Sequence, residues 1–219
     1  MTRASDVAID SPGGPLPGFF ARSFDFPNPT VIVVQEWWGL DGHIQDVALR
    51  FTGSQEYSSI APDLYRGKQT TEPDQAEKLM MGLDRDAVMA DLKATVEWLV
   101  RQGVERIAAV GFCMGGSLVF DLAHEDDRLS AAVAFYGMTD YEGRTPAAPL
   151  QAHYGTEDEW SAEQLEAVRA HLEVHGGEVH VYQGAAHAFF NNTGDTYDPD
   201  AAELAWERTL AFVGTHLGD

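Results

Sequence analysis

Apolar runs of strand length alternate with helical patterns along most of this 219-residue chain, and this alternation restricts the fold more than any other feature. In residues 30–34, four consecutive apolar residues follow a threonine, which is typical of a strand covered on both faces. Strands that alternate with helices predict an open, mostly parallel sheet with helices on both faces. The expected strands are residues 30–34, 57–61, 106–110, 131–136, 150–154 and 178–182, and the expected helices are residues 44–52, 74–81, 86–101, 117–123, 162–175 and 201–216.

The opening of the chain follows a different, turn-rich pattern. Residues 7–9 and 18–21 flank the turn sequence of residues 11–15, so we expect two short strands that form an antiparallel edge of the sheet. No internal repeat and no low-complexity linker divides the rest. We therefore expect one α/β domain over residues 1–219, long enough to build a sizeable core.

Charge excludes several classes of partner. The chain has 35 acidic and 14 basic residues, a formal net charge of -21, and no basic run. Nucleic-acid binding is not expected, because phosphate contacts need a basic face. An anionic membrane surface would repel such a chain, and no apolar stretch approaches the roughly 20 residues that span a bilayer.

Cysteine content and the N-terminal sequence bear on location. The single cysteine, Cys113, cannot form an intramolecular disulfide. The first ten residues lack the basic and apolar regions of a signal peptide. We therefore expect a cytoplasmic protein that is a monomer or a small homo-oligomer.

A glycine-flanked cysteine stands between an expected strand and an expected helix. The pattern Gly111-x-Cys113-x-Gly115 matches the strand–turn–helix elbow that presents a nucleophile, with sulfur in place of a serine oxygen. At a helix N-terminus the thiolate would be favoured, and free N–H groups could bind an oxyanion. The alternative is a small buried core cysteine. Two nucleotide-binding motifs do not fit, because Ser117 replaces the lysine of a phosphate-binding loop and Cys113 replaces a required glycine of a dinucleotide fingerprint.

Such an elbow predicts an acid and then a histidine on loops after later strands. Asp158 follows the expected strand 150–154, and His187 follows the expected strand 178–182. The histidine would take the thiol proton and later protonate the leaving group, while the aspartate would fix its tautomer. These three residues are the predicted catalytic set.

The other histidines suggest no cofactor. His171 and His175 lie four residues apart on an expected helix and could share a metal ion, but no third ligand is evident in the sequence. A solvated helix face explains them better, so we expect neither a metal nor a cofactor. We expect the histidines at 43, 124, 180 and 216 to be structural or surface residues.

Glu36 is a fourth candidate. It follows the most apolar expected strand and precedes Trp37 and Trp38, so it should emerge beside Cys113 at the carboxyl end of the sheet. Partial desolvation there would raise the pKa of the carboxyl group and suit it to share a proton with a thiol. The alternative is an ordinary solvated loop carboxylate.

Six collinear motifs extend over nearly the whole chain. They are Gln35-Glu36-x-x-Gly39, Ala61-Pro62-Asp63-Leu64-Tyr65, Gly111-x-Cys113-x-Gly115-Gly116, Tyr136-Gly137, Gly155-x-x-Asp158 and Ala186-His187-x-Phe189. Together they resemble the motifs of the dienelactone hydrolase (carboxymethylenebutenolidase) family. The resemblance implies an α/β-hydrolase fold, a Cys113, Asp158 and His187 triad, and a Glu36 that holds the resting thiol's proton until substrate displaces it. It also implies an oxyanion hole made by the backbone N–H groups of Trp37 and Met114.

The chain departs from that family at its carboxylate-binding arginines. One of these stands four residues after the catalytic histidine, where this chain has Asn191, and no arginine occurs between Gln69 and Leu83. Without a bidentate arginine contact the site loses its strongest preference for a carboxylate. We expect local cations to be supplied by Arg66, Lys68 or Arg144, and an apolar pocket to be lined by Trp37, Trp38, Tyr136, Met138, Trp160 and Phe189, each of which could instead pack in the core.

The sequence therefore predicts a hydrolase of small, uncharged carboxylic esters or lactones that works through a thioester acyl-enzyme. A different class of function stays open: a non-catalytic protein of the same fold whose pocket binds a ligand or a partner. A peptidase or thioesterase is disfavoured, because 219 residues leave no room for an inserted lid or propeller.

Overall fold

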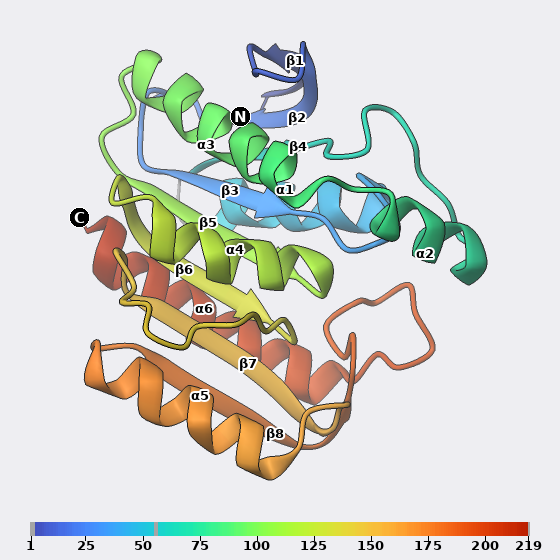
Figure 1. Ribbon diagram of the computed structural model, residues 1–219. Coiled ribbons are helices and arrows are strands. Elements are labelled where there is room, and N and C mark those ends of the chain that lie inside the picture. Colours follow the sequence, from blue (N-terminus) through green and yellow to red (C-terminus); the bar gives the residue numbers. More distant parts are fainter. Residues whose placement is uncertain (1–2, 55–56, 219) are drawn as a thin grey trace.

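Eight strands form one mixed sheet in the computed structural model, which describes residues 3–54 and 57–218. Their order across the sheet is β1-β2-β4-β3-β5-β6-β7-β8 (Figure 1). Strands β3 to β8 run parallel, and β2 joins β4 antiparallel, so β1 and β2 make an antiparallel edge. The strands are β1 (Arg3–Ile9), β2 (Leu16–Arg22), β3 (Thr30–Val34), β4 (Ser58–Pro62), β5 (Ile107–Phe112), β6 (Leu129–Phe135), β7 (Leu150–Glu157) and β8 (Glu178–Ala186).

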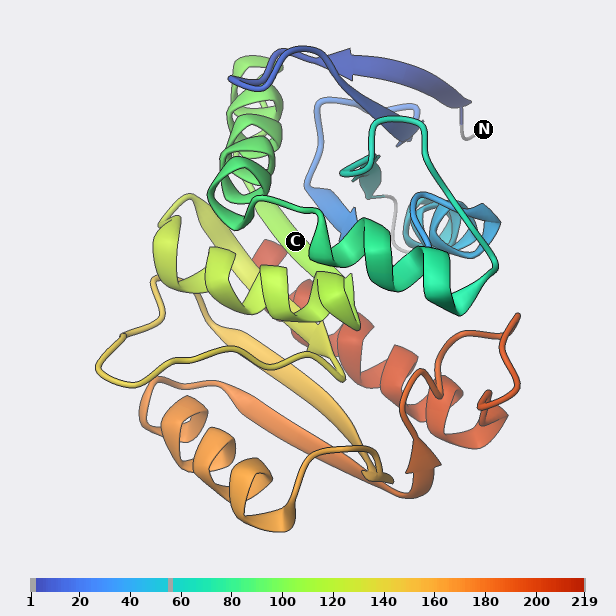
Figure 2. The same ribbon diagram turned by 45° about the vertical axis from the view of Figure 1, so that its right-hand side comes forward.

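Helices cover both faces of this sheet. Helices α3, α4 and α5 lie on the face toward the viewer in Figure 1, and α1 and α6 lie behind it; Figure 2 shows the same layers after a rotation. Helix α2 sits beyond the carboxyl ends of the strands. The helices are α1 (Gly42–Ser54), α2 (Pro73–Met81), α3 (Arg85–Arg101), α4 (Met114–Glu125), α5 (Ala162–Val174) and α6 (Pro199–Leu217).

The sheet separates two apolar cores. On one face, Leu92 and Val96 of α3 and Leu118 of α4 pack with residues of α5 and of the strands. On the other face, Phe51 of α1 and Phe212 of α6 pack with the alternate residues of the same strands. Because both faces are covered, β3 and β5 are buried at every position, which is why their sequences are continuous apolar runs.

Strand register places loops from distant parts of the chain beside one another. Val34 of β3 pairs with Gly111 of β5, so the residues two positions further on, Glu36 and Cys113, leave the sheet at the same level. The chain also changes direction here, since β4 and β5 lie on opposite sides of β3. The crevice at such a switch point is the usual place for a ligand in a parallel sheet.

The predicted architecture is confirmed: a mostly parallel sheet, helices on both faces and an antiparallel N-terminal edge. Local boundaries differ. Helix α4 starts at Met114, three residues earlier than predicted. Gly115 and Gly116 interrupt the helical pattern in the sequence, but they lie in the first turn of the helix, where it packs closely against neighbouring backbone. Across the described residues, no helix combines the length and hydrophobicity that a membrane span requires.

Phe51 should be a main source of stability in the second core. Its side chain is fully buried, with its ring centroid 4.5 Å from that of Trp206 on α6. We expect Phe51→Ala to lower the free energy of unfolding by about 3–5 kcal/mol, measured by urea denaturation, because it leaves a large cavity. Phe24 is 84% exposed, so the matched change Phe24→Ala should cost less than about 0.5 kcal/mol. Equal losses in the two variants would contradict this assignment of the core.

Candidate active site

Cys113 occupies a strained turn between β5 and α4. Its φ of 53° and ψ of -116° are values that a side-chain-bearing residue rarely adopts, and it stands immediately before the first residue of the helix. The flanking glycines make this turn possible. A Cβ at Gly111 would overlap the carbonyl of Gly115, and a Cβ at Gly115 would overlap the carbonyls that end β3. The half-buried thiol is therefore held at the helix N-terminus, at the carboxyl end of the sheet.

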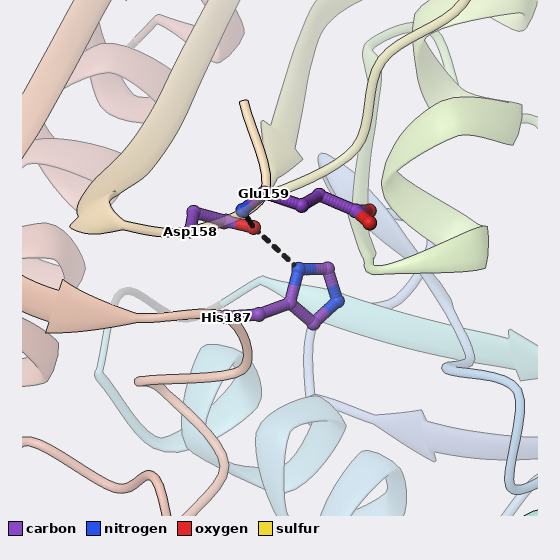
Figure 3. A group of neighbouring side chains, drawn as sticks. All are labelled: Asp158, Glu159 and His187. Carbon is purple, nitrogen blue, oxygen red and sulfur yellow. Dashed lines mark hydrogen bonds and ion pairs between the residues drawn. The ribbon is translucent and has the colours of Figure 1, made fainter. Parts of the chain in front are cut away.

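His187 and Asp158 come together at the ends of the last two strands. Glu157 of β7 pairs with Ala186 of β8, and Asp158 and His187 are the next residues on each strand. His187 Nδ1 lies 2.9 Å from Asp158 Oδ1, and the Asp158 side chain is fully buried (Figure 3). Burial lowers the pKa of His187, but hydrogen bonds to Asp158 and Cys113 outweigh it and raise the pKa to about 10. The structure therefore joins His187 to Asp158 by a hydrogen bond, and Cys113 lies close enough to the same imidazole to raise its pKa.

Glu36 lies nearby with a different set of partners. Its carboxylate is 2% exposed and accepts hydrogen bonds from the Tyr136 hydroxyl at 3.1 Å and from the Asn191 amide at 2.6 Å. Burial raises the pKa of Glu36 to about 7, against the opposing effect of these two bonds. Among the described residues, the hydrogen bonds to the Glu36 carboxylate come from Tyr136 and Asn191, and none joins it to Cys113.

Trp37 and Met114 flank the thiol on the two turns. Trp37 follows Glu36 in the loop after β3, and Met114 is the first residue of α4. The backbone N–H of a first helical residue has no acceptor within its helix, and it carries part of the positive end of the helix dipole. The site therefore has a donor at Met114 of the kind that stabilises a developing oxyanion.

Tyr136 and Asn191 are site residues whose roles were not predicted from the sequence. Tyr136 is almost completely buried, has a φ of 42°, and holds its ring centroid 5.0 Å from that of His187. The strain at Tyr136, directly after β6, is a signal that the sequence shows only as a tyrosine before Gly137. Asn191, noted as a replacement for an arginine, is buried and bonds to Glu36.

The other residues that were expected around the site lie in different environments in the structure. Tyr136 and Phe189 belong to the buried core, whereas Met138 and Trp160 pack at its edge and Trp37 and Trp38 are partly exposed. Two of the three expected cations are already engaged, since Arg66 pairs with Asp91 and Arg144 pairs with Asp121 and Glu125. A local supply of positive charge at the site is therefore smaller than the sequence suggested.

His171 and His175 were expected on a solvated helix face. His171 instead stacks on His124 with their Nε2 atoms 3.2 Å apart, and the His175 ring packs against His171 edge to face. Within the described ranges, one group of three offers ligand atoms that all lie within 4.8 Å of one another, namely Asp158, Glu159 and His187 (Figure 3). A cation held there would occupy His187 and thus compete with its bond to Asp158.

Sequence and structure comparisons place the chain among known proteins. A sequence profile described as "Dienelactone hydrolase family" matches residues 16–217. A Yersinia pestis protein named "Putative carboxymethylenebutenolidase" is 33% identical, over 96% of this chain and 88% of the relative. A Bradyrhizobium protein named "Probable 2-oxo-3-(5-oxofuran-2-ylidene)propanoate lactonase" is 30% identical, over 86% of this chain and 84% of the relative.

A solved structure gives the same result. The crystal structure of a "Putative Dienelactone Hydrolase" from Klebsiella pneumoniae superimposes with a TM-score of 0.85 and 30% sequence identity, covering 98% of this chain and 99% of the other. The likeness therefore extends over the sheet, both helix layers and the loops that carry Cys113, Asp158 and His187. The chain belongs to the dienelactone hydrolase family.

Proposed function

We propose that this protein hydrolyses small carboxylic esters or lactones with Cys113 as the nucleophile. The observation that carries the proposal is the strained Cys113 at the start of α4, beside His187, whose Nδ1 is hydrogen-bonded to the buried Asp158 carboxylate. A thiol beside a histidine that a carboxylate orients is the arrangement of an activated nucleophile. Relatives whose names refer to carboxymethylenebutenolidase and lactonase activity support an ester or lactone substrate.

The reaction runs in two halves. The Cys113 sulfur attacks the carbonyl carbon, and the oxyanion that forms is held by the backbone N–H groups of Trp37 and Met114. The tetrahedral intermediate collapses to a thioester as the imidazolium of His187 protonates the leaving alkoxide. His187 then takes a proton from water, which attacks the thioester and returns the thiol and a carboxylic acid. Asp158 stabilises the protonated imidazole throughout.

Glu36 acts as a positioning residue in this scheme. Its two oxygens tie Tyr136, which packs on His187, to Asn191, which lies four residues after His187. By fixing these two residues, Glu36 helps to hold His187 beside the thiol. The expected second role of Glu36, to hold the resting thiol's proton until substrate displaces it, stays a prediction.

Turnover of p-nitrophenyl acetate and of a small lactone by wild type and Cys113→Ala tests the proposal. We expect Cys113→Ala to lower kcat/KM at least about a thousandfold, because removing the nucleophile leaves only binding and oxyanion stabilisation. Cys113→Ser should retain activity well below that of wild type, since an alcohol is far less ionised than a thiol beside the same histidine.

Unchanged circular dichroism and thermal unfolding of both variants would show that the fold is intact. Equal turnover by wild type and Cys113→Ala would overturn the proposal. Absence of turnover by wild type on a panel of esters and lactones would instead favour the non-catalytic, ligand-binding alternative.

Buried Glu36 should also make stability depend on pH. Its pKa is about 7 in the folded protein, against an ordinary value of 4.5. Between these values the folded state binds a proton that the unfolded chain has lost, so stability falls as pH rises through this window, by about 3 kcal/mol in all. Glu36→Gln should not show this fall in stability, because glutamine has no proton to lose in this pH range. Urea denaturation from pH 4 to 8 should therefore give a wild-type curve that falls relative to that of the variant, and parallel curves would contradict the prediction.

A further inference from the structure

Glu159 brings an unpaired negative charge next to the catalytic histidine. It is the exposed residue immediately after Asp158, and its carboxylate belongs to the group whose ligand atoms lie within 4.8 Å of one another with His187. Figure 3 shows its side chain extending from the β7 loop over the His187 ring. In the described part of the chain, no hydrogen bond or ion pair engages this carboxylate. A substrate group that contacts His187 would therefore lie near the Glu159 carboxylate.

The surroundings reinforce this negative charge. Asp41, in the loop that follows Glu36, lies close enough to act on the Glu36 carboxyl group. Arg66 and Arg144 do not neutralise the site, because each is already paired with buried aspartates. Asn191 brings no charge, and its amide is bonded to Glu36. None of these residues supplies a free positive charge that would offset Glu159.

We propose that Glu159 makes this active site discriminate against esters that carry a carboxylate near the scissile bond, in favour of uncharged or cationic esters. The inference rests on the proposed function, since it concerns the approach to Cys113 and His187. When the scissile carbonyl of such an ester lies at Cys113, its carboxylate would lie within about 10 Å of the Glu159 carboxylate, a distance at which charges still interact. At that range and in a partly exposed site, like-charge repulsion lowers the rate about five- to tenfold, and added salt weakens it.

Alkylation of Cys113 tests this proposal without any ester. Iodoacetamide and iodoacetate both transfer a two-carbon group to the thiolate sulfur and release iodide, but only iodoacetate carries a negative charge. We expect Glu159→Gln to raise the ratio of the iodoacetate rate to the iodoacetamide rate about five- to tenfold at low salt. The ratio of the two rates is independent of any general change in thiol reactivity. Lys68 is present in both proteins, so its charge does not contribute to a difference between them.

Glu163→Gln is the matched control. Glu163 is an exposed carboxylate in the first turn of α5, outside the group at His187. The control removes the same charge at a different place, so the rate ratio should stay within about twofold of wild type. An unchanged ratio in Glu159→Gln, or an equal rise in Glu163→Gln, would overturn the proposal. Failure of Cys113 to react with either reagent would overturn both this proposal and the proposed function.

Ester hydrolysis gives the second measurement. We expect wild type to hydrolyse p-nitrophenyl valerate with a higher kcat/KM than the p-nitrophenyl monoester of glutaric acid, which replaces the terminal methyl with a carboxylate. Glu159→Gln should raise kcat/KM for the glutarate ester about five- to tenfold and leave the valerate ester within twofold. If the ratio of kcat/KM for the two esters is the same in wild type and Glu159→Gln, the proposed role of Glu159 is overturned but the proposed function is not. If wild type hydrolyses neither ester, the proposed function is overturned.

Discussion

The closeness of backbone to backbone where β5 turns into α4 is the constraint on which the site depends. Gly111 and Gly115 meet across this turn, and Gly116 and Gly137 meet where α4 passes the end of β6, with no room for a Cβ at any of the four positions. Because of this contact, α4 can start directly after Cys113, and the thiol lies at the positive, N-terminal end of the helix. The placement of the thiol at the helix N-terminus, the strained turn and the nearness of the thiol to His187 therefore all depend on this one backbone contact.

Parallel register explains why residues so far apart in the chain meet. Each strand of the parallel part delivers its following loop to the same edge, and the pairs Val34–Gly111 and Glu157–Ala186 set the levels at which those loops leave the sheet. This is also why the sequence could predict Cys113, Asp158 and His187 at one edge of the sheet. The glycine spacing marked the turn, and the alternation of strands and helices assigned the acid and the histidine to loops at the same edge.

The parts of the site that the sequence did not predict depend on side-chain directions across the sheet. Tyr136 is in the sequence a motif residue and a candidate for the pocket lining, and only the structure shows its positive φ, its bond to Glu36 and its ring contact with His187. Glu159 is one of 35 acidic residues, and nothing in its neighbours distinguishes it. Asn191 could be recognised as a missing arginine but not as a partner of Glu36, because that contact joins residues 155 positions apart.

The loop after β8 shows how the fold holds His187 in place. His187 is followed within four residues by Phe189 and Phe190, both buried in the second core, and by Asn191, whose amide is bonded to Glu36. Ala188 has a left-handed conformation with a φ of 61°, between the half-buried His187 and the two buried phenyl rings. An apolar anchor and a buried polar anchor thus hold the same short segment. The cost of burying Glu36, visible in its raised pKa, is offset because the carboxylate orders the loop that carries His187.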